Sequence, residues 1–134
     1  MPTVSIILPT YNRLPRLQKV LAGLAAQTYP LANMEVVIIS DGSTDGTNTF
    51  LQADVAPLRV RPLVQANRGP AAARNLGLQV AQGELVIFLD DDVVPEPQLV
   101  AEHVNTHRQQ QSDIVVLGPM LTPPTVELKP WVAW

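Results

Sequence analysis

Short apolar runs alternate with segments of helical character along this chain, and this alternation restricts the fold more than any other feature. Strand-like runs lie at 4–8, 35–40, 58–65, 85–89 and 113–117. Helical spacing or helix-boundary residues mark the segments 14–24, 43–51, 71–81 and 97–110. Strands that alternate with helices form mostly parallel sheets with helices on both faces, and such buried strands are continuously apolar, as these are. The sequence therefore predicts an α/β fold.

Prolines and glycines refine the predicted boundaries. Pro62 interrupts the run at 58–65 and favours an edge strand or a bulge, because proline cannot donate a hydrogen bond to a neighbouring strand. Pro70 suits the first turn of a helix, and we expect Gly83 to stop that helix in the C′ position. Residues 118–134 contain four prolines and no apolar period, so we expect irregular structure there.

Length and composition limit the number of domains and the classes of partner. A chain of 134 residues with 46% hydrophobic content can bury one core, so we expect one α/β domain at 1–117 and an irregular segment at 118–134. Nine lysines and arginines are scattered along a chain of net charge -3, which argues against a nucleic-acid partner. No apolar run approaches the length of a membrane span. The absence of cysteine excludes disulfides and is compatible with the cytoplasm, where we expect this protein.

Polar clusters follow four of the predicted strands, where parallel sheets bind their ligands. The clusters are Thr10-Tyr11-Asn12, Asp41-Gly42-Ser43, Asn67-Arg68-Gly69 and Asp90-Asp91-Asp92. A solvated loop can explain any one cluster, but four clusters at one sheet edge favour a ligand site. The adjacent carboxylates of the last cluster repel one another by about 3 kcal/mol per pair at an effective dielectric of about 20, so they favour a bound cation or proton.

Five motifs occur in a fixed order along the chain: VSIILPTYNR, QTYP, VVIISDGSTDGT, NRGPAAARNLGL and GELVIFLDDDVVPEPQL. From Val4 to Leu99 the chain resembles the N-terminal, nucleotide-sugar-binding half of a family 2 glycosyltransferase with the Rossmann-like GT-A fold. Linked motifs in register are more specific than any single one. The resemblance implies transfer of a sugar from a nucleotide-diphosphate donor, with inversion at the anomeric carbon and with a divalent metal, Mn²⁺ or Mg²⁺.

The resemblance also implies roles for the acidic residues. Asp90 and Asp92 match the Asp-x-Asp motif of the family, and we expect Asp92 on the metal and Asp90 on the ribose or on the metal through water. Alternation at a strand end directs these two side chains to the same side while Asp91 points elsewhere. Acids that match Asp41 accept a hydrogen bond from the base of the donor. An imino N–H of uracil or guanine suits that contact better than adenine does, so we expect a UDP- or GDP-linked donor.

The remaining candidates surround the expected nucleotide. The segment Thr10-Tyr11 would pack against base and ribose, and Arg68 would pair with the diphosphate or the base, whereas Arg74 and Asn75 would brace the donor loop. Glycines would let the backbone approach the ligand closely. The candidate nucleotide-sugar-binding residues are Pro9, Thr10, Tyr11, Asn12, Asp41, Gly42, Asn67, Arg68, Gly69, Asp90 and Asp91, and the candidate metal ligands are Asp92 and Asp90.

The acceptor side of the reaction is not evident in these residues. Inverting transfer needs a general base, which the family places well downstream of its Asp-x-Asp motif. Neither Asp113 nor Glu127 matches that context, so we expect the base beyond residue 134 and a truncated chain that lacks its acceptor half. Such a chain would bind a donor without transferring its sugar to a carbohydrate, lipid or protein acceptor. Two alternatives follow. The chain is a non-catalytic nucleotide-sugar-binding module, or it is part of a longer chain that attaches to the inner face of a membrane.

Three further patterns have alternative interpretations. The run LVIFLDDDVV also fits the signature of aspartate-nucleophile (HAD-like) phosphatases, although that superfamily has its motif on the first strand. His103 and His107 have a spacing that can bind zinc, but without an H-E-x-x-H pattern a solvated helix face is favoured. Trp131 and Trp134, if exposed, would favour association into a homo-oligomer.

Overall fold

The computed structural model describes residues 3–122 and 124 of the chain. The strands are β1 (Val4–Thr10), β2 (Met34–Asp41), β3 (Val60–Gln65) and β4 (Leu85–Phe88). The helices are α1 (Leu14–Ala25), the 3-10 helix η1 (Leu31–Asn33), α2 (Thr47–Gln52), α3 (Pro70–Val80) and α4 (Leu99–Gln109). The predicted α/β fold is confirmed.

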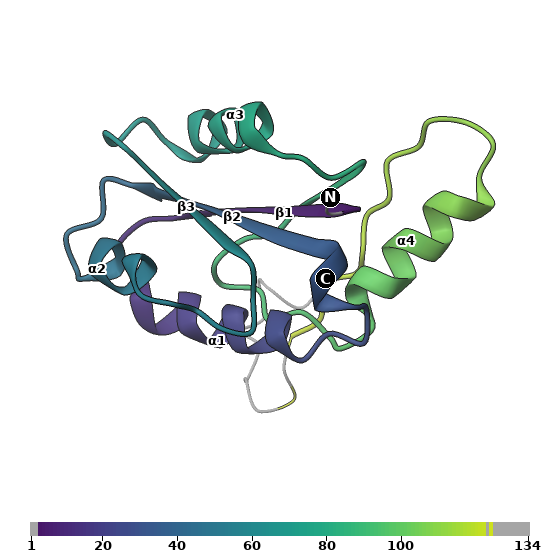
Figure 1. The fold of residues 1–134 in the computed structure, drawn as a ribbon, viewed down its shortest axis with the longest axis horizontal. Helices are drawn as coiled ribbons and strands as arrows, with labels where there is room; N and C mark the ends of the chain where they lie inside the picture. Colours follow the sequence, from purple (N-terminus) through teal and green to yellow (C-terminus); the bar gives the residue numbers. More distant parts are fainter. Residues whose placement is uncertain (1–2, 123, 125–134) are drawn as a thin grey trace, which may run out of the picture.

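All strand pairs are parallel, and the strand order is β3-β2-β1-β4. Helix α3 covers one face of the sheet, and helices α1 and α2 cover the other (Figure 1). The chain proceeds outward from β1 to β3 and then crosses to the opposite side of β1 to form β4. This reversal creates a topological switch point between β1 and β4, where loops diverge and ligands bind in sheets of this kind.

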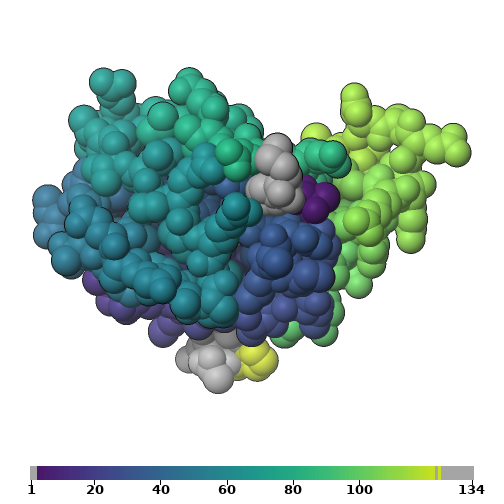
Figure 2. Space-filling model, viewed as in Figure 1, coloured from purple at the N-terminus to yellow at the C-terminus, as the bar shows by residue number. Residues whose placement is uncertain are grey.

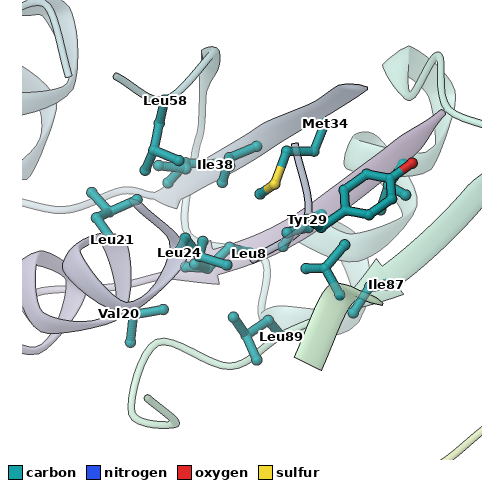
Figure 3. Close-up of a cluster of buried hydrophobic side chains, with 14 of the residues drawn as sticks. Leu8, Val20, Leu21, Leu24, Tyr29, Met34, Ile38, Leu58, Ile87 and Leu89 are labelled. Atoms are coloured by element: carbon teal, nitrogen blue, oxygen red, sulfur yellow. The ribbon is translucent and has the colours of Figure 1, made fainter. Parts of the chain in front are cut away.

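Each face of the sheet has its own hydrophobic core. Helix α1 buries Leu17, Val20, Leu21 and Leu24 at the spacing expected of one helix face, and these belong to the same core as residues of the strands. Figure 3 shows Val20, Leu21 and Leu24 in this core. On the other face, α3 approaches the strands so closely that a Cβ atom on Gly77 would lie 2.6 Å from Cγ2 of Ile7. Every residue of β1 and β2 is buried, as their continuous apolar pattern predicts.

Two local predictions are wrong. Residues 113–117 form no strand, and Val115 and Leu117 are 92% and 91% exposed, because no neighbouring strand lies beside them in the described part of the chain. Gly83 is not at the C′ position of α3, since Ala81 is already the C-cap. Its small size serves packing, because a Cβ atom on Gly83 would lie 2.5 Å from the backbone nitrogen of Ser5.

The edges of the sheet differ in how well the sequence predicts them. Pro62 lies in β3, which is an edge strand as predicted. The most apolar run became β4, which within the described residues is the opposite edge, and Phe88 is 49% exposed there. An apolar run of strand length therefore predicts a strand here but not a central position.

The C-terminal part of the described chain stands out from the body. Helix α4 packs through Val100 and Val104, and in Figure 2 the helix and the segment after it project to one side. Residues 118–122 contain no helix or strand, whereas Glu127, Trp131 and Trp134 lie outside the described residues. Within residues 3–122 and 124, no helix combines the length and the apolar character needed to cross a bilayer.

Candidate functional site

A cleft of about 470 Å³ opens at the carboxyl edge of the sheet, next to the switch point between β1 and β4. It is lined by Pro9, Thr10, Tyr11, Arg13, Asp41, Asn67, Gly69, Pro70, Arg74, Asp90, Asp91 and Asp92. The structure thus brings most of the predicted site residues together, whereas Asn12, Gly42 and Arg68 do not line this cleft.

Asp41, the last residue of β2, is a buried carboxylate of the cleft. Its Oδ1 accepts hydrogen bonds from Nε2 of Gln65 at 2.7 Å and from the backbone N–H of Arg68 at 2.8 Å. Its Oδ2 accepts one from the backbone N–H of Gly69 at 3.0 Å. Burial raises the pKa of Asp41, but these three hydrogen bonds outweigh it and hold the pKa below the ordinary value. Asp41 is therefore ionised at neutral pH, and Oδ2 has a lone pair left for a ligand.

Asp90, Asp91 and Asp92 form the acidic cluster, a turn that follows β4. In this turn the N–H of Val93 donates to the carbonyl of Asp90 at 3.3 Å. Asp91 is buried and accepts hydrogen bonds from Oγ1 of Thr10 at 2.9 Å and from Nη1 of Arg13 at 3.1 Å. The side chains of Asp90 and Asp92 are 53% and 44% exposed. Asp91 thus anchors the turn to the end of β1, and its two neighbours remain accessible in the cleft.

Two arginines contact the acidic turn. Nη2 of Arg74 lies 2.7 Å from Oδ1 of Asp90, and Nη1 of Arg13 lies 3.7 Å from Oδ2 of Asp92. Sequence reasoning gave Arg74 only a bracing role and did not single out Arg13. Arg13 directly follows the Thr10-Tyr11-Asn12 cluster, and Arg74 lies four residues after Pro70 on the same helix face, so both positions adjoin predicted site residues.

Residues beside the cleft fix the loops that form it. Asn12 adopts a left-handed conformation with φ 51, and its Oδ1 accepts a hydrogen bond from the N–H of Thr44 at 2.7 Å. Gly42 has φ 80, a conformation that side chains disfavour, and a Cβ atom there would lie 3.2 Å from the backbone nitrogen of Asn67. In the structure Asn12 and Gly42 therefore shape the loops, while Arg68 contributes its backbone N–H to Asp41.

Asp45 connects two helix N-termini near the cleft. Its Oδ1 accepts from the N–H and the hydroxyl of Thr47 at 3.1 and 2.6 Å, and its Oδ2 accepts from the N–H of Leu14 at 3.0 Å. The hydrogen bond from the Thr47 hydroxyl, followed by that from Leu14, lowers the pKa of Asp45. The carboxylate satisfies backbone donors at the starts of both α1 and α2.

The charges of the cleft favour a bound cation. Four aspartates and two arginines line it, which gives a formal charge of -2. Within residues 3–122 and 124, no three His, Cys, Asp or Glu side chains are close enough to form a complete metal site. Mg²⁺ and similar cations are commonly held by one or two carboxylates together with substrate phosphates, so Asp90 and Asp92 fit a site that is shared with a ligand.

His103 and His107 lie on α4 and do not line the cleft. Burial lowers the pKa of His103, and the neighbouring charge of His107 contributes to the shift. Neither histidine belongs to a three-residue metal cluster within the described ranges.

The fold and the cleft define an α/β protein with a cleft, lined by acidic residues, at the switch point of a parallel sheet. The sequence model of glycosyl transferase family 2 matches residues 5–133, and the chain belongs to this family. Validoxylamine A glucosyltransferase of Streptomyces hygroscopicus subsp. jinggangensis (strain 5008) is 38% identical over 120 residues, which are 88% of this chain and 28% of that protein. Glycosyltransferase AglE of Haloferax volcanii is 35% identical over 117 residues, which are 86% of this chain and 38% of that protein. The chain therefore spans about a third of the length of these relatives.

Solved structures show the same fold. The structure of S. aureus TarS 1–349 in complex with UDP aligns with a TM-score of 0.75 and 31% identity, over 81% of this chain and 32% of that one. Mannosyltransferase PcManGT from Pyrobaculum calidifontis, in complex with GDP-Man and Mn²⁺, aligns with a TM-score of 0.71 and 35% identity, over 77% and 31%. The GT-A fold is confirmed, and membership of this family argues against the phosphatase interpretation.

Proposed function

We propose that this chain forms the donor and metal site of a glycosyltransferase that takes a sugar from a nucleotide-diphosphate donor, with a divalent cation and with inversion at the anomeric carbon. The observation that carries the proposal is the accessible pair Asp90 and Asp92 in a cleft of formal charge -2. An anionic diphosphate would be repelled from such a cleft unless a cation accompanied it. The complexes of TarS with UDP and of PcManGT with GDP-Man and Mn²⁺ support the same ligand class.

The base of the donor would lie near Asp41. This carboxylate is ionised and has a lone pair on Oδ2, so it can accept a hydrogen bond from an imino N–H of uracil or guanine. Adenine has no such proton at its Watson–Crick edge. Tyr11 lines the cleft and is 47% exposed, which leaves its ring free to pack against the base or the ribose together with Pro9 and Thr10. The proposed donor is therefore a UDP- or GDP-sugar.

A Mn²⁺ or Mg²⁺ ion would be held by Asp92, and by Asp90 directly or through water. When bound, such an ion stabilises the negative charge that develops on a diphosphate leaving group. Asp91 would hold the turn that presents both carboxylates, because its own oxygens are bonded to Thr10 and Arg13. Asn67 and Gly69 also line the cleft and would contact the donor.

Transfer also requires a group that deprotonates the acceptor hydroxyl. The described acids of the cleft are all assigned to the donor, the metal or the turn. None of them is left to act as the general base, and we propose that this group comes from the part of the relatives that this chain does not match. The identity of the acceptor would be determined by that part.

Calorimetric titration of the chain with UDP, GDP and ADP, each with and without Mn²⁺, tests the proposal. We expect UDP or GDP to bind in a metal-dependent manner, and Asp92→Asn to weaken that binding by about tenfold or more, because the carboxylate charge is lost without a change in size. Asp113→Asn is the matched control, since Asp113 is exposed and does not line the cleft. A folded wild-type chain that binds none of the nucleotides would overturn the proposal.

Because the proposed general base lies in a part of the relatives that this chain does not match, a chain extended over that part separates an enzyme from a binding module. Release of UDP or GDP from the sugar donor can be measured with candidate carbohydrate, lipid or protein acceptors. Nucleotide binding without any such release would support the alternative, a nucleotide-sugar-binding module without turnover.

A further inference from the structure

Arg74 lies in the cleft, where both proposed ligands, a nucleoside diphosphate and a divalent cation, would change its contacts. Its guanidinium lies 2.7 Å from Oδ1 of Asp90, one of the two carboxylates proposed for the metal. The side chains of Arg74 and Asp90 are 34% and 53% exposed, so the pair is in contact with solvent. Solvent-exposed ion pairs of this kind are weak and re-form at little cost. Arg74 can therefore leave Asp90 for a partner of higher charge.

Arg13, the other arginine of the cleft, has a different environment. It donates to Asp91, whose side chain is only 7% exposed and whose other oxygen accepts from Thr10. Departure of Arg13 would leave a buried carboxylate short of a partner, which is costly. Arg13 is therefore held in place by Asp91, whereas Arg74 can exchange its partner.

A nucleoside diphosphate and a divalent cation both favour release of Arg74 from Asp90. A guanidinium binds phosphate oxygens in a bidentate manner and gains more there than from one exposed carboxylate. A divalent cation at Asp90 would be repelled by a guanidinium on the same carboxylate. Each ligand thus binds more strongly to the arrangement in which Arg74 has turned away from Asp90.

We propose that Arg74 couples nucleotide binding to metal binding by exchanging partners: it pairs with Asp90 until a nucleoside diphosphate enters, then pairs with the diphosphate, and Asp90 becomes available to the cation. The inference rests on the proposed function, because it requires both ligands in this cleft. Linkage requires the coupling to be reciprocal, so the nucleotide raises the affinity for the cation by the factor by which the cation raises the affinity for the nucleotide.

The test measures Mn²⁺ affinity of the 134-residue chain from the electron paramagnetic resonance signal of the unbound aqueous ion. Titrations are made without nucleotide and with saturating UDP or GDP, whichever binds. For the wild-type chain we expect nucleotide to tighten Mn²⁺ binding by about tenfold or more.

For Arg74→Gln we expect two changes of opposite sign. Mn²⁺ alone should bind about two- to fivefold more tightly, because the competing cation is gone. The nucleotide alone should bind more weakly, because the diphosphate loses its guanidinium partner. The coupling factor should fall severalfold but stay above one, since phosphates still contact the metal directly. Structural damage would instead weaken the binding of both ligands.

Two variants control for charge. Arg16→Gln removes the same charge from an exposed residue of α1 that does not line the cleft, and it should behave as wild type. Arg74→Lys keeps the charge and should retain part of the coupling, with circular dichroism used to verify the fold of each variant.

The outcomes separate the two levels of inference. If UDP or GDP binds to wild type with Mn²⁺ but Arg74→Gln has the wild-type coupling factor, or binds Mn²⁺ alone more weakly, the exchange of Arg74 is wrong and the proposed function stands. If neither nucleotide binds to the wild-type chain with Mn²⁺, both are overturned.

Discussion

The two ends of the sheet use carboxylates and arginines in opposite ways. At the amino end, Glu35 of β2 is 2% exposed, and its Oε1 accepts from the hydroxyl of Ser5 at 2.6 Å and from the N–H of Gln82 at 2.8 Å. Nη2 of Arg61 lies 3.4 Å from its Oε2. The Ser5 hydroxyl in turn accepts from the N–H of Gly83 at 2.8 Å. The acid at this end is satisfied by the protein itself.

At the carboxyl end, Asp90 and Asp92 are about half exposed, and each is near a single arginine. A carboxylate can accept about four hydrogen bonds, so both residues, which line the cleft, can still accept from a ligand. The comparison separates two roles that the residue types alone do not distinguish. A carboxylate filled with internal hydrogen bonds contributes to the fold, and one with unfilled acceptors in a cleft is available to a ligand.

The largest effect is expected from Glu35→Ala, which removes the acid at the amino end. Ser5, Gln82 and Arg61 would lose their common partner, and a buried network broken in this way costs about 3 kcal/mol in the free energy of unfolding. Urea denaturation measures this loss. Nucleotide affinity of the folded fraction should stay as in wild type, because Glu35 lies at the opposite end of the sheet from the cleft.

Glu35→Gln is the companion variant, since it retains an acceptor for Ser5 and Gln82 while it removes the charge that faces Arg61. It should lose less stability than Glu35→Ala. An unchanged free energy of unfolding in both variants would contradict the structural role assigned to the amino end.

Asp91→Ala tests whether burial, and not the end of the sheet, determines the role of an acid. Asp91 lies in the acidic cluster but is bonded to Thr10 and Arg13 as Glu35 is bonded to its neighbours. We expect a loss of about 2 kcal/mol in the free energy of unfolding, because a buried hydrogen-bonded group is removed. Asp92→Ala should lose much less, and thermal or urea unfolding of the two variants side by side gives the answer. Equal losses in both variants would show that the comparison fails within the cluster.

Most of the fold could be predicted because its causes are local or periodic. The apolar runs that became β1 and β2 are buried on both faces, and a strand buried in this way is visible in the sequence as continuous hydrophobicity. The segment 113–117 has the same local character but no strand. Whether an apolar run joins a sheet depends on a neighbouring strand, and that partner is not encoded in the run itself. The same argument applies to Gly83, since its position in the sequence predicts a helix end but its actual constraint is the backbone of Ser5.

The sequence predicts where the candidate site lies better than it predicts the hydrogen bonds and ion pairs within the site. Topology alone brings the ends of β1, β2 and β4 together, so Thr10, Asp41 and the acidic cluster could be placed at one edge from the order of motifs. Which of three adjacent aspartates is buried depends on the turn after β4 and on hydrogen bonds from Thr10 and Arg13. The long side chain of Arg13 contacts the acidic cluster, which is far from Arg13 in the sequence. Sequence spacing does not show which residues such a side chain contacts.

A third, smaller effect is expected from Asp45→Ala, which removes the acceptor of the first backbone N–H groups of α1 and α2. Loss of a side-chain acceptor at a helix N-terminus costs about 1 kcal/mol in the free energy of unfolding. The pKa of Asp45 is lowered from 3.8, so its stabilising effect is present above that pH and is lost as the pH falls through the folded-state pKa. Urea denaturation at several pH values should therefore show a difference from wild type near neutrality that shrinks below about pH 3.8. A difference that is independent of pH would mean that the ionised carboxylate does not stabilise these helix N-termini.

His103→Gln should give the smallest effect, because His103 lies on α4 and contacts neither group of acids in this comparison. Burial lowers the pKa of His103 from 6.5, so the unfolded chain binds a proton more readily than the folded one. The contribution of neutral His103 to the free energy of unfolding is fully present above pH 6.5 and declines as the pH falls below it. His103→Gln should therefore reduce the pH dependence of the free energy of unfolding in this range. His107→Gln removes only the secondary contribution, because burial of His103 remains, so most of the decline should persist. Urea denaturation between pH 7.5 and 5 measures both profiles, and a decline of unchanged slope in His103→Gln would assign the mild acid sensitivity to other groups.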